Sequence, residues 1–284
     1  MNNNSLKKAS EKLLFQIPEG SRLSGQTRRR GLSLLSFTTI LLIWIGLSGS
    51  GLWKPIADPL FLPSPFSVIK TFFRLLNEGY QGATLYQHFF FSLFRFSVAF
   101  IFCITVGTAV GLMMGMNETI QAVLDPPIEI TRPIPKLAVL PLLIIWFGIG
   151  ELPKVVIIVL TLFPMMSIAS MQAVKSVSIS KIQAAQSLGA NKRILFTRVI
   201  LPASLPGIFT GIRVSLGVGV TMLVAAEMIA TSNGIAWMAL NAADFLLTDV
   251  VLVGVLILAF LGYGLEQIAR MIEKRVVHWS GKET

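Results

Sequence analysis

The sequence predicts an all-α integral membrane protein with about six membrane-spanning helices. Of the 284 residues, 54% are hydrophobic and 13% are charged, and the mean hydropathy is +0.73. Soluble domains carry about 25% charged residues. A bilayer core about 30 Å thick takes roughly 20 apolar residues per helix, so a chain of this length holds roughly five to seven spans and no large soluble domain.

Apolar windows place the six spans along the chain. They cover residues 32–51, 89–116, 121–150, 155–174, 205–231 and 249–272. No small-residue cleavage pattern follows the first window, which we therefore interpret as an uncleaved helix and not as a signal peptide. The expected organisation is listed by residue range: a basic segment 1–30, a first helix with an outer loop 31–88, a helical core 89–272 and a tail 273–284.

The distribution of charge predicts the orientation in the membrane. Seven cations precede the first span, five lie between residues 175 and 198, and four lie from residue 270 onward, whereas the opposite loops hold four. Cytoplasmic loops of membrane proteins are rich in Lys and Arg. Both termini are therefore expected in the cytoplasm, and the net charge of +10 does not indicate nucleic acid.

The residues needed for metal or enzyme chemistry are sparse. The single cysteine, Cys103, lies in an apolar run, and the two histidines, His88 and His278, are far apart in sequence. An integral-membrane enzyme would need acids, histidines or a nucleophile converging on facing helices. We expect no disulfide, no metal site and no cofactor.

The outer loop after the first span predicts a short helix at the membrane interface. Ser64 is a suitable N-cap, Pro65 suits the first helical position, and Gly79 suits the end of the helix. Its broad apolar face predicts that the helix lies flat against lipid. It serves either as an anchor or as a docking surface for an outside partner.

Two spans carry glycines four residues apart, which is typical of close helix packing in lipid. These residues are Gly107, Gly111 and Gly115 in the second span and Gly207 and Gly211 in the fifth.

The third span is predicted to be broken. Five prolines remove backbone donors from it: Pro126, Pro127, Pro133, Pro135 and Pro141. Irregular backbone at membrane depth is tolerated where it is buried in protein or lines a wet cavity, so the break marks either a solute path or a structural kink.

Charged residues in the spans are candidates for lining that path. The first are Arg132, Glu129 and Lys136, and the second are Arg213 and Glu227. The alternative for each is an ion pair or a side chain that reaches the interface, and Arg95, near the start of its span, fits that alternative best.

The loop between the fourth and fifth spans, residues 175–202, is basic and contains no acidic residue. Ser180 is expected to cap a short helix that Gly189 ends in a left-handed turn, and a second helix is expected to run to Pro202. Such a helix suits insertion into a groove on a cytoplasmic partner, and it could equally be an idle interfacial loop.

The same loop resembles the "EAA" loop of the permeases of ATP-binding-cassette (ABC) importers. The resemblance rests on Gln183-Ala184-Ala185, Gly189, Val199, Leu201 and Pro202, with Gln183 where the family has Glu. It implies a coupling helix that docks into the ATP-hydrolysing subunit. The implied contact residues are Gln183, Ala184, Ala185, Ser187, Leu188, Gly189 and Ala190.

The resemblance covers residues 60–282 and is greatest to the taurine, alkanesulfonate, nitrate and bicarbonate branch, with taurine permeases nearest. The stretches that carry it are 82–89, 132–151, 223–230, 245–252 and 275–282, while Lys136, Val139 and Thr221 depart from the family pattern. It implies the type I importer permease fold in the bacterial inner membrane. It also implies that the permease works as a homodimer with two ABC ATPase subunits and a periplasmic or lipid-anchored solute-binding protein.

The expected function is therefore import of a small anionic or zwitterionic solute, taurine or a related sulfonate. The chain has no Gly-x-x-x-x-Gly-Lys-Ser/Thr loop, so ATP-Mg is expected on the partner subunit. The alternatives are import of nitrate, bicarbonate or a pyrimidine or thiamine precursor, and a scaffold or channel without ATPase coupling.

Overall fold

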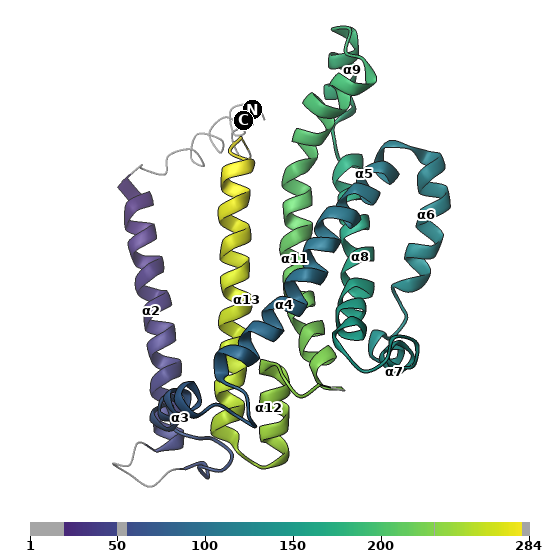
Figure 1. The fold of residues 1–284 in the computed structure, drawn as a ribbon. Coiled ribbons are helices and arrows are strands. Elements are labelled where there is room, and N and C mark those ends of the chain that lie inside the picture. Colours follow the sequence, from purple (N-terminus) through teal and green to yellow (C-terminus); the bar gives the residue numbers. More distant parts are fainter. Residues whose placement is uncertain (1–19, 50–55, 230, 280–284) are drawn as a thin grey trace, which may run out of the picture. The chain divides into compact units, whose positions relative to one another are not determined.

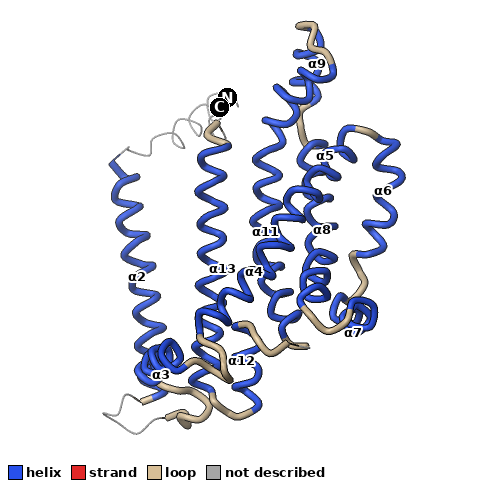
Figure 2. Tube along the Cα trace, viewed as in Figure 1, coloured by secondary structure: helices blue, strands red, loops and turns tan. Residues whose placement is uncertain are grey.

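The computed structural model describes residues 20–49, 56–229 and 231–279, and this part of the chain is almost entirely helical (Figures 1 and 2). The helices are α2 (Gly20–Ser48), α3 (Pro65–Glu78), α4 (Leu85–Phe102), α5 (Thr108–Met116), α6 (Glu118–Thr131), α7 (Lys136–Phe147), α8 (Glu151–Lys175), α9 (Ile179–Ser187), α10 (Lys192–Ile194), α11 (Leu201–Glu227), α12 (Ile235–Asp244) and α13 (Thr248–Val276). Two π-helical turns, η1 (Cys103–Gly107) and η2 (Leu195–Ile200), join α4 to α5 and α10 to α11.

The chain divides into two units, residues 1–67 and 68–284, each of which is described by itself. The first unit contains α2, whose apolar part is Leu34–Ser48. Its Trp44 Nε1 donates to the Pro63 carbonyl at 3.1 Å, which holds the following loop against the helix. The predicted end of this span, Gly51, lies outside the described residues, as do much of the predicted segment 1–30 and the end of the tail.

Four helical stretches in the second unit are long and apolar enough to span a membrane. These are Leu85–Met116, Glu151–Lys175, Lys192–Glu227 and Thr248–Val276. The pair α6 and α7 makes a fifth, bent by 98° at the break. The predicted helical membrane fold is thus confirmed, with four or five spans among the described residues and the predicted first span present as a shorter apolar helix.

Proline has less effect on the helices than the sequence predicts. Pro126 and Pro127 lie inside α6, and the third span breaks after them, at Pro133 and Pro135. Pro202 was expected to end a helix, but it lies in the first turn of α11, directly after the π turn η2. A π turn already interrupts the regular backbone hydrogen bonds, so a missing proline amide is accommodated there.

Helix α3 has the caps that the sequence predicts. The Ser64 hydroxyl accepts a hydrogen bond from the Ser67 amide at 3.2 Å, and Gly79 ends the helix with φ +76°. Its inner face is held to α13, because the Thr71 hydroxyl donates to Asp249 at 2.5 Å. The large apolar side chains on its other face, which include Phe66 and Phe73, are exposed and available to lipid.

Helix α8 is the centre of the second unit. Its Ile157, Ile158, Leu162 and Met166 are fully buried, between α4 and η1 on one side and α11 on another. The glycines lie where backbones approach α8 most closely: a Cβ atom at Gly111 would lie 2.2 Å from the Ser167 carbonyl oxygen. A Cβ atom added at the other glycines would also lie too close to a Cβ atom of α8. The distances are 3.0 Å from Gly107 to Met166, 2.7 Å from Gly115 to Val174, 2.8 Å from Gly207 to Ala173 and 2.6 Å from Gly211 to Ala169.

We predict that Gly111→Leu separates α5 from α8, because the added side chain meets backbone that cannot move aside. We expect the free energy of unfolding to fall by about 1–3 kcal/mol, which is the usual effect of overpacking. The measurement is thermal unfolding in detergent. Gly217→Ala in α11 is the control, since no atom lies within 4 Å of its added Cβ, and equal unfolding temperatures for the two variants would contradict the prediction.

Candidate functional site

Helix α9 projects from one end of the second unit, past α5 and the end of α8 (Figure 1). None of its residues is buried. It begins at Ile179 after Ser178, two residues earlier than a cap at Ser180 would place it. Gly189 has φ +80°, the left-handed turn that the sequence predicts, and the Ala190 amide donates to the Ala185 carbonyl at 3.0 Å across that turn.

The seven residues expected to contact an ATPase all lie on α9 and the turn after it. Ala185 and Ala190 are half-buried, and the other five are exposed: Gln183, Ala184, Ser187, Leu188 and Gly189. The side chain of Asn191 caps the following helix by accepting from the Ile194 amide at 2.9 Å.

The base of α9 is fixed to the helix bundle. Val174, Val177 and Ile200 form a buried apolar cluster between the end of α8 and the start of α11, and Ile182 of α9 packs against it. Displacement of α9 must therefore displace the ends of two long helices, because a packed cluster transmits strain.

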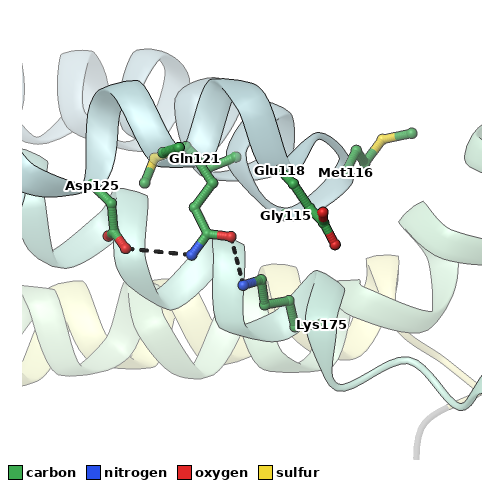
Figure 3. A pocket seen from close by; sticks show the side chains of 8 residues that line it. Gly115, Met116, Glu118, Gln121, Asp125 and Lys175 are labelled. Carbon is green, nitrogen blue, oxygen red and sulfur yellow. Dashed lines mark hydrogen bonds between the residues drawn. The ribbon is translucent and has the colours of Figure 1, made fainter.

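A polar cavity of about 570 Å³ lies beside this base, between α5, α6 and the last residue of α8 (Figure 3). Lys175 Nζ donates to Gln121 Oε1 at 2.7 Å, and Gln121 Nε2 donates to Asp125 Oδ2 at 3.3 Å. This chain of hydrogen bonds joins α8 to the first half of the broken span.

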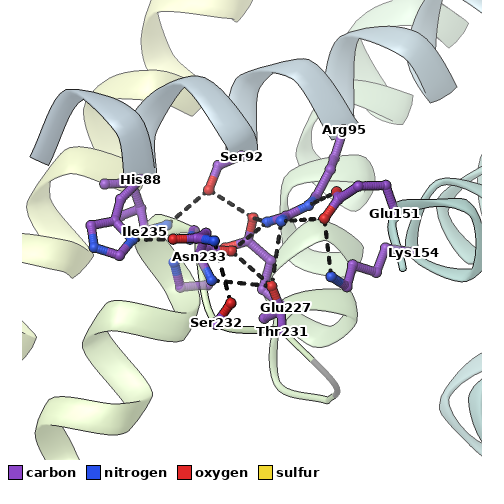
Figure 4. Close-up of polar contacts among 12 residues, drawn as sticks. His88, Ser92, Arg95, Glu151, Lys154, Glu227, Thr231, Ser232, Asn233 and Ile235 are labelled. Carbon is purple, nitrogen blue, oxygen red and sulfur yellow. Dashed lines mark hydrogen bonds and ion pairs between the residues drawn. The ribbon is translucent and has the colours of Figure 1, made fainter. Parts of the chain in front are cut away.

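A buried ion network lies at the opposite end of the second unit (Figures 1 and 4). Its centre is Arg95 of α4, whose side chain is 1% exposed. Arg95 Nη1 donates to Glu227 Oε1 at 2.7 Å, and Nε and Nη2 form a two-pronged pair with Glu151. The remaining acceptors are the Asn233 carbonyl and the Thr231 hydroxyl. A guanidinium group has five N–H donors, so every donor of Arg95 has an acceptor.

Glu227, at the end of α11, is the fully buried carboxylate of the network. Its Oε1 also accepts from the Ser92 hydroxyl at 2.7 Å, and its Oε2 accepts from the Ala236 amide at the start of α12 at 3.0 Å. Gly234 has φ +139°, and a Cβ atom there would lie 2.3 Å from Glu227 Oε2. Only glycine allows the α11–α12 loop to approach the carboxylate this closely.

His88 extends the network as a neutral imidazole. Its Nδ1 accepts from the Gly234 amide at 3.1 Å, so the proton lies on Nε2, which donates to the Tyr80 carbonyl at 3.1 Å. The ring stacks on Trp237. Burial raises the pKa of the Tyr80 phenol above its usual range, and the neutral phenol donates to Asn241 Oδ1 at 3.0 Å.

Charge within the network is balanced. The Lys154 side chain is 5% exposed, and its ammonium group donates to Glu151 Oε1 at 3.2 Å. Arg95 and Lys154 thus face Glu151 and Glu227. A buried charge is tolerated when it is paired and hydrogen-bonded, and both conditions are met here.

The structure does not bring the five candidate path residues together. Arg132 pairs with Glu129 at 3.0 Å, with both side chains 51% exposed, and Lys136 Nζ donates to the Thr131 carbonyl. The other two are in separate places: Arg213 pairs with Glu273 of α13 at 3.3 Å, and Glu227 pairs with Arg95.

Sequence reasoning missed Glu151, Lys154 and Ser92 as members of this network. A signal was present, because charged groups in spans pair with one another, and Arg95 and Glu227 are two opposite charges in spans.

The family model for the binding-protein-dependent transport system inner membrane component matches residues 104–278, more than half of the chain. The chain is also 40% identical over 257 residues to the taurine transport system permease protein TauC of Escherichia coli K12, covering 90% of this chain and 92% of that protein. The chain therefore belongs to the binding-protein-dependent permease family. It is an inner membrane transport subunit, not an enzyme.

Further similarities agree with this assignment. The putative aliphatic sulfonates transport permease protein SsuC of Bacillus subtilis 168 is 31% identical, over 87% of this chain and 86% of its own. The fold matches a chain of the inward-facing MetNI methionine ABC transporter, with a TM-score of 0.51, 18% identity and coverage of 65% of this chain and 95% of that one. An amino acid ABC transporter crystallised with histidines gives a TM-score of 0.52 at 16% identity, covering 73% and 96%.

We predict that Arg95→Leu lowers the free energy of unfolding by about 3–5 kcal/mol, because it leaves Glu227 buried without its partner. Arg132→Leu is the matched control and is expected to cost less than about 1 kcal/mol, since its pair with Glu129 is half exposed. Thermal unfolding in detergent measures both.

The double variant Arg95→Leu/Glu227→Leu separates pairing from packing. It removes both charges, so it is expected to be more stable than the sum of the two single changes predicts. Additive losses would contradict the assignment of Arg95 and Glu227 as a coupled pair.

Proposed function

We propose that this chain is the membrane-spanning subunit of an ATP-driven importer of taurine or a related small sulfonate. The proposal of the solute is supported by 40% identity to a taurine permease and by the second relative, a sulfonate permease. Two copies of the chain would work with two ABC ATPase subunits and a solute-binding protein in the bacterial inner membrane.

The proposal that this chain is coupled to ATP hydrolysis rests on the position and exposure of α9. A nine-residue helix without a buried residue projects from the unit, while its base is fixed to the ends of two long helices. In the proposed cycle, ATP closes the ATPase pair and α9 moves with it. The ends of α8 and α11 then move, and the paired permeases open to the outside, until hydrolysis resets them.

The orientation follows from the cations at the α9 end of the unit. Lys192 and Arg193 lie at the start of the helix that leads into α11, and Lys274 and Arg275 lie in the last turn of α13, at the same end (Figure 1). Because cytoplasmic ends are rich in such residues, we assign α9 and the end of α13 to the cytoplasm, and the seven cations that precede the first span assign the N-terminus to the same side. The exposed apolar face of α3 then lies against lipid at the outer surface.

For the solute path we propose the break of the third span. Glu129 and Arg132 are half exposed there, next to Lys136, whereas Arg213 and Glu227 are engaged with Glu273 and Arg95. Broken spans in transporters are placed where solute passes.

Growth tests the solute directly. In a bacterium lacking its own taurine and sulfonate permeases, this chain with its ATPase and binding protein is expected to restore growth on taurine or an alkanesulfonate as sole sulfur source. Growth with nitrate as sole nitrogen source, in a strain lacking nitrate permease, is not expected. Failure on every sulfonate with rescue on nitrate would overturn the solute, and rescue without the ATPase subunit would overturn the coupling.

A further inference from the structure

Two cations occupy an electrostatically unfavourable place on the projecting segment. Lys192 and Arg193 form the first turn of the helical stretch Lys192–Glu227. The amino end of a helix carries partial positive charge, so cations there are destabilising.

Nothing in the described part of the chain offsets this cost. Both side chains are exposed, and neither forms an ion pair with a described residue. Residues 175–202 contain no Asp or Glu at all. Cations at the amino end of a helix, without a contact that offsets their cost, indicate that Lys192 and Arg193 have a functional role.

The turn beside these cations also presents an apolar side chain. Leu188 is 89% exposed, and it stands between the end of α9 and the left-handed Gly189. The cap at Asn191 and the hydrogen bonds across the turn fix its position relative to Lys192 and Arg193. A leucine presented on such a turn stabilises an interface when it leaves water and enters an apolar pocket.

We infer that the surface of the partner that binds residues 188–193 is an apolar pocket with an acidic rim. The pocket receives Leu188, and carboxylates on the rim face Lys192 and Arg193. This inference rests on the proposed function, because the partner is the cytoplasmic ATPase subunit. Arg193 suits a two-pronged contact with a carboxylate. Gln183, in place of an acid, keeps the segment free of groups that an acidic rim would repel.

An anionic membrane surface is the other partner that exposed cations attract. The geometry favours the protein, because α9 projects past α5 and the end of α8 (Figure 1), and Leu188 and the two cations follow α9 directly in the chain. Lipid headgroups would meet the ends of the spans before the tip of a projecting segment.

The test compares two double variants with the same change in charge at the same end of the unit. Lys192→Glu/Arg193→Glu is expected to bind the purified ATPase subunit at least about tenfold more weakly than wild type, and wild-type binding is expected to weaken with salt. The control Lys274→Glu/Arg275→Glu changes α13 away from the projecting segment and is expected to bind as wild type does. Leu188→Asp is expected to weaken binding at both low and high salt.

Each outcome decides the question. Unchanged ATPase affinity of Lys192→Glu/Arg193→Glu, or an equal loss in the control, overturns the acidic rim. Loss of binding to phosphatidylglycerol vesicles with unchanged ATPase affinity assigns the cations to lipid instead. A wild-type chain that does not bind the ATPase at any salt concentration refutes the proposed function itself, which a failure confined to the variants does not.

Discussion

The arrangement of the second unit depends on one buried guanidinium group. Arg95 joins α4 to the start of α8, to the end of α11 and to the loop that leads into α12. Removing such charges from water costs several kcal/mol per ion, and only a nearly complete set of partners offsets it. The network therefore has one geometry in which it is stable, and the helix ends are held in that geometry.

The two ends of the unit are consequently held by different kinds of contact. At the Arg95 end the helices are tied by hydrogen-bonded charges, of which Arg95, Lys154 and Glu227 are buried and Glu151 is 42% exposed. At the α9 end they are held by a small apolar cluster, Val174, Val177 and Ile200, and by the half-exposed contacts of Lys175 and Gln121.

Much of this structure could be predicted from local signals in the sequence. The apolar windows predicted the spans, because the thickness of the bilayer sets the length of a span. The cap residues Ser64 and Gly79 predicted the ends of α3, because a cap acts on the adjacent backbone. Gly189 likewise predicted the left-handed turn after α9, because the effect of glycine on the backbone is local. What failed were details that depend on neighbours in space: the helix passes through Pro202 because a π turn precedes it, and the pairing of Arg95 with Glu227 joins residues 132 positions apart. Sequence spacing does not show which residues meet, and the one available signal, that Arg95 and Glu227 are opposite charges in spans, does not name the partner of each.

The π turn η1 has a consequence for how the second span tolerates change. From Ala99 to Gly111 the buried residues of this span recur every four positions: Ala99, Cys103, Gly107 and Gly111. In an unbroken α-helix a four-residue repeat drifts around the axis by about 40° per step, and the additional residue of a π turn offsets about 100° of that drift. One continuous helix can thereby aim Arg95 at its carboxylates and Gly111 at the α8 backbone. The number of residues across η1 keeps those two faces in phase, so inserting or deleting one residue there would turn Gly111 away from the α8 backbone.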